Sequence, residues 1–126
     1  MDKHGLAIVL GRVISHNFYF PQGGKMSYIM TVHGMLKGND ENASKKLHDT
    51  LAAQAKPLGA SFGNVHHQPY LNPENPREFF DVDVWNDDLA GLKKFLADPS
   101  MAQVFGQMFE GMPEVKVYVD KGWMKW

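Results

Sequence analysis

The stretch EFFDVDVW (residues 78–85) carries the pattern that decides the fold. Side chains of a β-strand point alternately to the two faces of a sheet, so this stretch divides into two sets. One set is apolar and consists of Phe80, Val82 and Val84. The other set alternates aromatic rings with carboxylates, at Phe79, Asp81, Asp83 and Trp85. The apolar set predicts the face that helices cover, and the mixed set predicts a functional role for the opposite face.

The composition predicts one globular domain. The chain has 126 residues, of which 44% are hydrophobic and 21% charged, and its formal net charge is -1. It therefore offers no basic surface for nucleic acid or an anionic membrane, and neither is expected as a partner. The absence of cysteine excludes disulfides and thiolate catalysis and fits a reducing compartment. The apolar run at 6–10 is too short for a membrane span or a signal-peptide core, so a cytoplasmic location is expected.

The chain divides into an N-terminal extension and a main domain. Residues 1–25 contain the strand-like run GLAIVLGRVISHNFYF and end in a Pro and Gly turn. They are interpreted as an added strand, as an arm that pairs with another subunit, or as vector- or start-site-derived sequence, with the arm or edge strand favoured. Residues 26–126 are expected to form the complete small domain.

The main domain alternates strand and helix patterns in a recognisable order. The expected elements are strands near 27–36, 61–70, 78–85 and 114–120 and helices that begin near 40, 86 and 98. This is the α+β, ferredoxin-like split βαβ arrangement, in which the helices cover one face of an antiparallel sheet.

Local signals predict where the elements begin and end. Asp40 or Asn42 caps the first helix, and Pro57 with Gly59 ends it. Asn86 or Asp87 opens the second helix, and Asp98 with Pro99 starts a further one, which Gly111 and Pro113 stop. The turn NPENP (72–76) is expected outside the sheet because of its prolines.

The face opposite the helices is expected to pack against a second copy of the chain. It carries Phe79, Trp85 and Tyr118, which is too much aromatic surface to leave in water. Two such sheets packed face to face would form a closed, two-fold symmetric barrel with a small cavity between them. The sequence therefore predicts a homodimer.

From Met26 onward the layout resembles a known family. The segment WNDDLAGLKKFLADPSMAQVF (85–105), after the third strand, and the short valine-rich last strand are similar to the dimeric α+β barrel superfamily. Within it, the chain most resembles the antibiotic biosynthesis monooxygenase domain and its quinol-monooxygenase relatives. Members of the superfamily oxygenate electron-rich aromatic compounds without metal or flavin, cleave haem, isomerise lactones or bind small molecules. The resemblance implies the fold, whereas the function must come from the site.

The resemblance has one informative departure. Haem-degrading members carry a haem-ligating histidine in the second helix, and residues 88–105 contain none. Haem is therefore not expected, and we expect a cofactor-free protein. Any acid-base group must come from the sheet.

The alternation of strand residues selects the candidate catalytic groups. His33 is the expected base, with Asp81 or Asp83 as its orienting partner, because a histidine and a carboxylate in a semi-apolar pocket are suited to proton abstraction. The resemblance implies that such a site deprotonates a phenol or carbon acid, whose anion then reacts with dioxygen. The expected function is a small monooxygenase-like enzyme acting on an aromatic or quinone-like molecule. The expected substrate-binding residues are Phe79, Trp85, Tyr118 and Thr31.

Non-catalytic interpretations remain open. Asp81 and Asp83 would also fit a solvent-exposed sheet face or lysine partners across a dimer interface. Trp85 and Tyr118 would also fit interface anchors. The alternative function is therefore a non-catalytic dimer of the same fold that binds a small ligand or a partner.

Adjacent histidines raise the question of a metal site. His66 and His67 point to opposite faces of a strand, so they cannot bind one ion together. One of them with His33 and Asp81 would imitate a site of two histidines and one carboxylate. No metal is the expectation.

Overall fold

The computed structural model describes residues 27–86 and 88–126, so the predicted arm (1–25) lies outside the described residues. The elements are β1 (Ser27–Leu36), α2 (Glu41–Ser61), β2 (Asn64–Asn72), β3 (Asn75–Asn86), α3 (Leu89–Ala97), α4 (Pro99–Met108) and β4 (Phe109–Val119). The predicted order of strands and helices is confirmed.

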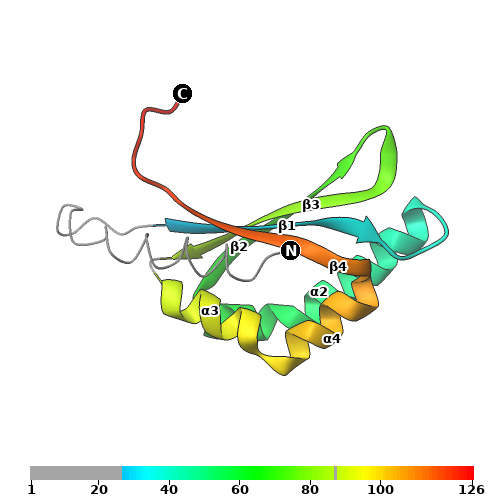
Figure 1. The fold of residues 1–126 in the computed structure, drawn as a ribbon, viewed down its shortest axis with the longest axis horizontal. Helices are drawn as coiled ribbons and strands as arrows, with labels where there is room; N and C mark the ends of the chain where they lie inside the picture. Colours follow the sequence, from blue (N-terminus) through cyan, green and yellow to red (C-terminus); the bar gives the residue numbers. More distant parts are fainter. Residues whose placement is uncertain (1–26, 87) are drawn as a thin grey trace.

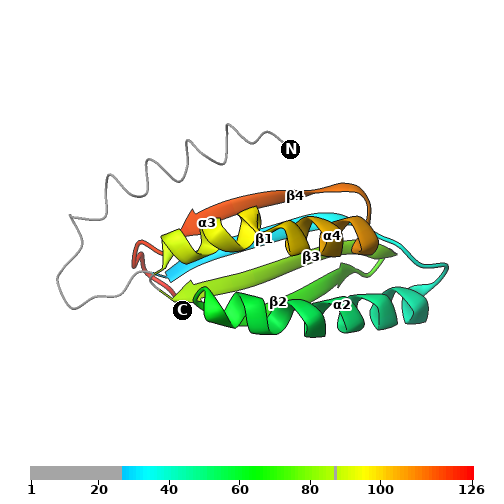
Figure 2. The ribbon, with the colours of Figure 1, turned by 90° about the horizontal axis from the view of Figure 1, so that it is seen from below.

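The four strands form one antiparallel sheet in the order β2-β3-β1-β4. Among the described residues, three helices lie on one face of it and none lies on the opposite face (Figure 1). Helix α2 runs along the β2 side, while α3 and α4 run along the β4 side (Figure 2). This is the ferredoxin-like arrangement that the sequence predicts.

Two aspartates start helices as predicted. Asp40 caps α2, where its Oδ1 accepts the N–H of Ala43 at 2.8 Å. Asp98 caps α4 and accepts the N–H of Ser100 at 2.9 Å, with Pro99 in the first helical position.

Two predicted helix boundaries are wrong. Helix α2 continues through Pro57 to Ser61, because Pro57 lies on the exposed side, where the backbone groups that proline leaves without a helical partner can bind water. Helix α3 begins at Leu89 and not near Asn86, because Asp88 is the cap and accepts the N–H of Gly91 at 2.6 Å.

Two strands are longer than predicted, and both contain proline. Strand β4 starts at Phe109, directly after α4, so Gly111 and Pro113 lie inside the strand. Strand β3 likewise includes Pro76. The β1–β4 register shifts between His33 and Met35, opposite this part of β4, and such an irregularity accommodates glycine and proline within a sheet.

The predicted faces of β3 are inverted in the structure. Asp81 and Asp83 are each 5% exposed and Trp85 is fully buried under the helices, whereas Phe80 is 40% exposed on the other face. The pairing with β1 fixes this orientation: Met30, a core residue, lies opposite Asp83. This orientation removes two large aromatic rings, Phe79 and Trp85, from water, whereas the opposite orientation would bury one ring, Phe80, and two valines.

The face assignment of β4 is confirmed. Val115 and Val117 are buried beneath the helices, and Tyr118 is half exposed on the opposite side. We call the helix-free side of the sheet the outer face; its apolar and aromatic residues are Ile29, Tyr70, Phe80, Val82, Val84 and Tyr118. Within the described part of the chain, no helix combines the length and apolar character that crossing a bilayer requires.

Gly91 provides a test of how α3 packs. A Cβ atom at Gly91 would lie 1.9 Å from the carbonyl oxygen of Phe62, so backbone must move to admit alanine. We expect Gly91→Ala to lower the free energy of unfolding by about 1–3 kcal/mol, the usual cost of overpacking. Chemical denaturation measures this change.

Gly106 is the matched control, because a Cβ there meets nothing within 4 Å in the exposed part of α4. Gly106→Ala should raise stability by about 0.5–1 kcal/mol through helix propensity. Equal effects of the two substitutions would contradict the close approach of α3 to Phe62.

Candidate active site

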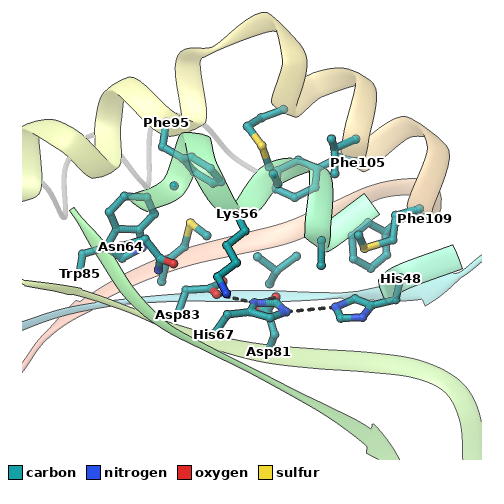
Figure 3. Close-up of a pocket in the computed structure, with 18 residues that line it drawn as sticks. His48, Lys56, Asn64, His67, Asp81, Asp83, Trp85, Phe95, Phe105 and Phe109 are labelled. Atoms are coloured by element: carbon teal, nitrogen blue, oxygen red, sulfur yellow. Dashed lines mark hydrogen bonds and ion pairs between the residues drawn. The ribbon is translucent and has the colours of Figure 1, made fainter. Parts of the chain in front are cut away.

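A cavity lies between the helix-covered face of the sheet and the helices, within a single chain. The volume of this cavity is about 90 Å³. Most of its wall is apolar and comes from both layers, including Met30, Val32, Trp85, Phe95, Val104 and Phe105. Its polar groups gather toward the β2 side, at His48, Lys56, Asn64, His67, Asp81 and Asp83 (Figure 3).

The polar end is built around two carboxylates and one histidine. Asp81 and Asp83 are two residues apart on β3 and therefore share a face. His67 is the cross-strand partner of Asp83, and its Nδ1 lies 2.6 Å from Asp83 Oδ1 and 3.5 Å from Asp81 Oδ2. A base and a carboxylate are thus in direct contact at the cavity wall.

Burial gives Asp81 an unusual protonation state. Desolvation, followed by the negative charge of Asp83 and a hydrogen bond shared with Asp83, raises the pKa of Asp81 to about 10. A backbone hydrogen bond from Val32 opposes this shift in part. At neutral pH Asp81 therefore holds a proton, and it can act as a hydrogen-bond donor inside the cavity.

Two buried polar atoms at the cavity wall lack a partner within residues 27–86 and 88–126. They are Oδ1 of Asp81 and Nε1 of Trp85. Buried polar groups are nearly always hydrogen-bonded in folded proteins. These atoms therefore mark positions where a bound molecule could supply the missing hydrogen bonds.

A second histidine, His48 of α2, completes the polar end. Its Nε2 lies 3.1 Å from Nε2 of His67, and its Nδ1 lies 3.0 Å from Oδ1 of Asp49. The His48 ring also packs against Phe79, with ring centroids 5.2 Å apart. His48 was missed by the sequence reasoning, although it shares the buried stripe of α2 with Ser44 and Leu51 at helical spacing.

The structure places only part of the predicted site together. Asp81, Asp83 and Trp85 line the cavity, and Phe79 is buried behind it against His48. The predicted location of the cavity, between the sheets of two copies, is wrong for these residues. The reason is the inverted orientation of β3, which turns its acidic face toward the helices of its own chain.

His33, Thr31 and Tyr118 lie on the outer face. Val32 pairs with Asp81, so His33 points away from the two aspartates, and the predicted pairing of His33 with them is wrong. The Nε2 of His33 instead lies 2.9 Å from Glu78 Oε2. Thr31 and Tyr118 are equally separated from the cavity by the sheet.

Metal binding is chemically conceivable at the same cluster. One ligand atom each from His67, Asp81 and Asp83 lies within 4.8 Å of the others. A cation there would have to displace the proton of Asp81 and the His67–Asp83 hydrogen bond. His33 is not part of this group, so the site of two histidines and one carboxylate that includes His33 is excluded.

The raised pKa of Asp81 predicts a pH-dependent stability. The unfolded chain releases this proton near the ordinary value of 3.8, whereas the folded chain retains it to much higher pH. The contribution of neutral Asp81 to the free energy of unfolding is therefore complete below the pKa that Asp81 has in the unfolded chain. It is lost as the pH rises toward the pKa of Asp81 in the folded chain. Asp81→Asn, which stays neutral, should gain stability relative to the wild type between about pH 5 and pH 9, by up to about 1.4 kcal/mol per pH unit.

Urea unfolding at several pH values measures this difference. Asp98→Asn is the control, because hydrogen bonds from Ser100 lower the pKa of Asp98, and its carboxyl is already ionised across this range. The stability difference for Asp98→Asn should stay constant. A constant difference for Asp81→Asn as well would show that Asp81 ionises normally.

Comparison with known proteins places the fold. No family model and no curated protein sequence matches the chain. SnoaB from Streptomyces nogalater, a cofactor-independent oxygenase, superposes with a TM-score of 0.52 at 13% identity, over 80% of this chain and 95% of its own. A protein from Nitrosomonas europaea, provisionally named an antibiotic biosynthesis monooxygenase, gives 0.57 at 14% identity, over 84% of this chain and 99% of its own.

A third solved structure agrees with these two. A Bordetella bronchiseptica protein with the same provisional name has a TM-score of 0.54 at 18% identity, over 75% of this chain and 95% of its own. Each match covers nearly the whole length of the other protein and at least 75% of this chain. The chain therefore shares the fold of these three proteins, two of which are provisionally named antibiotic biosynthesis monooxygenases.

Proposed function

We propose that the protein is a cofactor-independent, monooxygenase-like enzyme that acts on an aromatic or quinone-like small molecule. The observation that carries the proposal is the contact of His67 with Asp83 beside the protonated Asp81, at the polar end of an aromatic-lined cavity. The fold shared with SnoaB, a cofactor-independent oxygenase, supports this class of reaction.

The proposed reaction starts with proton abstraction. The His67–Asp83 pair takes a proton from a phenol or an activated CH₂ group, which leaves an electron-rich anion. Protonated Asp81 donates a hydrogen bond to the oxygen that gains negative charge, because its carboxyl is held neutral and has an atom without a partner. Asp83 and Asp81 thus have separate roles as base and donor.

Dioxygen is the oxidant in this proposal. The anion transfers an electron to dioxygen, and the two radicals combine into a carbon-bound peroxide. The peroxide anion takes up one proton and then loses water, which converts CH₂ into C=O, so that one oxygen atom enters the product and the other leaves as water. The apolar wall, which includes Phe95 and Phe105, packs against the substrate ring and limits the entry of water.

Oxygen uptake with a panel of hydroquinones and anthrone-like phenols tests the proposal. Asp83→Asn and His67→Gln should each lower kcat by about 10²–10⁴-fold, the usual contribution of a positioned acid-base group. His33→Gln is the matched control, because His33 lies on the outer face, and it should keep wild-type kcat.

Uptake that Asp83→Asn and His67→Gln leave unchanged would overturn the site assignment. No uptake by the wild type with any compound, combined with binding of the same compounds by calorimetry, would favour the alternative of a non-catalytic ligand-binding protein. The two buried atoms without partners, Asp81 Oδ1 and Trp85 Nε1, fit a bound ligand in either case.

We also propose that a second copy of the chain covers the outer face. Tyr70, Phe80 and Tyr118 are 53%, 40% and 50% exposed there, and the neighbouring Val82 and Val84 are only partly buried. An aromatic surface of this kind on a sheet is typical of an interface. In this arrangement each chain keeps its own cavity, on the far side of its sheet.

Light scattering coupled to gel filtration tests the dimer. The wild type should have the mass of two chains, and Phe80→Glu should reduce it to one, because a carboxylate without a partner would be buried at the interface. Ala102→Glu adds the same charge on the exposed surface of α4 and should leave the dimer intact. A wild-type mass of one chain would refute the proposal.

A further inference from the structure

Four side chains form a continuous hydrogen-bonded chain from the cavity to the protein surface. Asp83 contacts His67 at 2.6 Å, His67 contacts His48 at 3.1 Å, and His48 contacts Asp49 at 3.0 Å. The side chain of Asp83 is 8% exposed at the inner end, and that of Asp49 is 53% exposed at the outer end. Figure 3 shows His67 and His48 joined edge to edge beside the two aspartates.

The number of protons in this chain follows from its contacts. Each of the three contacts needs one hydrogen between its two heavy atoms. When Asp83 and Asp49 are ionised they donate none, so the two imidazoles must supply all three ring N–H groups. Two neutral imidazoles have only two N–H groups, so the chain holds one extra proton.

The extra proton can occupy either end of the chain. In one arrangement His48 is doubly protonated, and the neutral His67 donates to ionised Asp83 from Nδ1. In the other, Asp83 carries the proton, and each histidine is neutral and donates outward. Moving one hydrogen across each of two contacts converts one arrangement into the other, which carries a unit of positive charge between the cavity and α2.

We propose that Asp83, His67, His48 and Asp49 form a proton relay between the cavity and the surface. This inference rests on the proposed function for its catalytic purpose, because proton abstraction from a substrate loads Asp83 with a proton, and the peroxide that forms later takes one proton back. When Asp83 takes up this proton, another proton leaves the outer end of the chain. His48 releases it through Asp49 to water. His48, at the cavity wall, and Asp49, at the surface, thereby act as proton-transfer residues.

The surroundings favour release at Asp49. The side chain of His67 is 35% exposed, but both its ring nitrogens have protein partners, so its protons pass along the chain. His48 is nearly buried between Asp49, His67 and the ring of Phe79. Lys45 donates to Asp49 at 2.7 Å and, with His48, lowers the pKa of Asp49, so this carboxylate accepts a proton only transiently.

Nitrogen NMR of the full chain labelled with ¹⁵N-histidine tests the proton count without any substrate. At neutral pH, His48 and His67 should together show three protonated ring nitrogens and one unprotonated nitrogen. Asp49→Asn removes the outer carboxylate and should reduce the count to two. Glu41→Gln, which removes a negative charge from the exposed first turn of the same helix, should leave three.

Oxygen uptake tests the transfer step. His48→Gln can keep a hydrogen bond but cannot pass a proton on, so kcat should fall by about 10²-fold with little change in KM. Added imidazole should restore part of the lost rate, and a purely structural role would show no such rescue. His66→Gln is the control, because His66 is next to His67 in β2 but points to the outer face. This substitution should change neither the rate nor its response to imidazole.

The outcomes separate the relay from the proposed function. A count of two ring N–H groups in the wild type, together with a ¹³C shift of the Asp83 carboxyl that shows it ionised, would overturn the relay even if oxygen uptake is observed, whereas a protonated Asp83 accounts for two neutral imidazoles. Unchanged kcat in His48→Gln would overturn it as well. Absence of uptake in the wild type would refute the proposed function, and the proton count would still decide whether the chain carries the extra proton.

Discussion

The site depends on one constraint: each of two buried carboxylates must either hold a proton or have a hydrogen-bond partner. Strand β3 turns Asp81 and Asp83 toward the helices, together with Phe79 and Trp85. Each ionised carboxylate in such a place would lose several kcal/mol of hydration, so both cannot stay charged without partners. Asp81 remains protonated, and Asp83 contacts His67 of β2, so these three residues form the polar end of the cavity.

Much of the fold could be predicted from the sequence. Alternating apolar residues marked β1 and β4, and Asp98 with Pro99 marked the start of α4, because these signals are local. Helix α2 ends later and strand β4 begins earlier than predicted, because proline does not always end an element. Pro57 and Pro113 are both accommodated, the first on an exposed helix surface and the second near a register shift.

The site could be predicted only in part. Asp81 and Asp83 were singled out because two carboxylates between aromatic rings fit neither a core nor a wet surface. Their partner was sought on β1, at His33, because the orientation of β3 relative to β1 cannot be read from either strand alone. One residue of register decides which face each residue joins, and the pairing of Val32 with Asp81 sends His33 to the other side.

The His48–His67 hydrogen bond also joins two structural layers. It connects α2 to β2, the edge strand, beside the partly exposed side chains that border the cavity. A molecule that entered between α2 and β2 would have to separate these two rings and would thereby break the hydrogen-bonded chain. In the proposed relay, ligand entry by this route and proton transfer would therefore alternate in time.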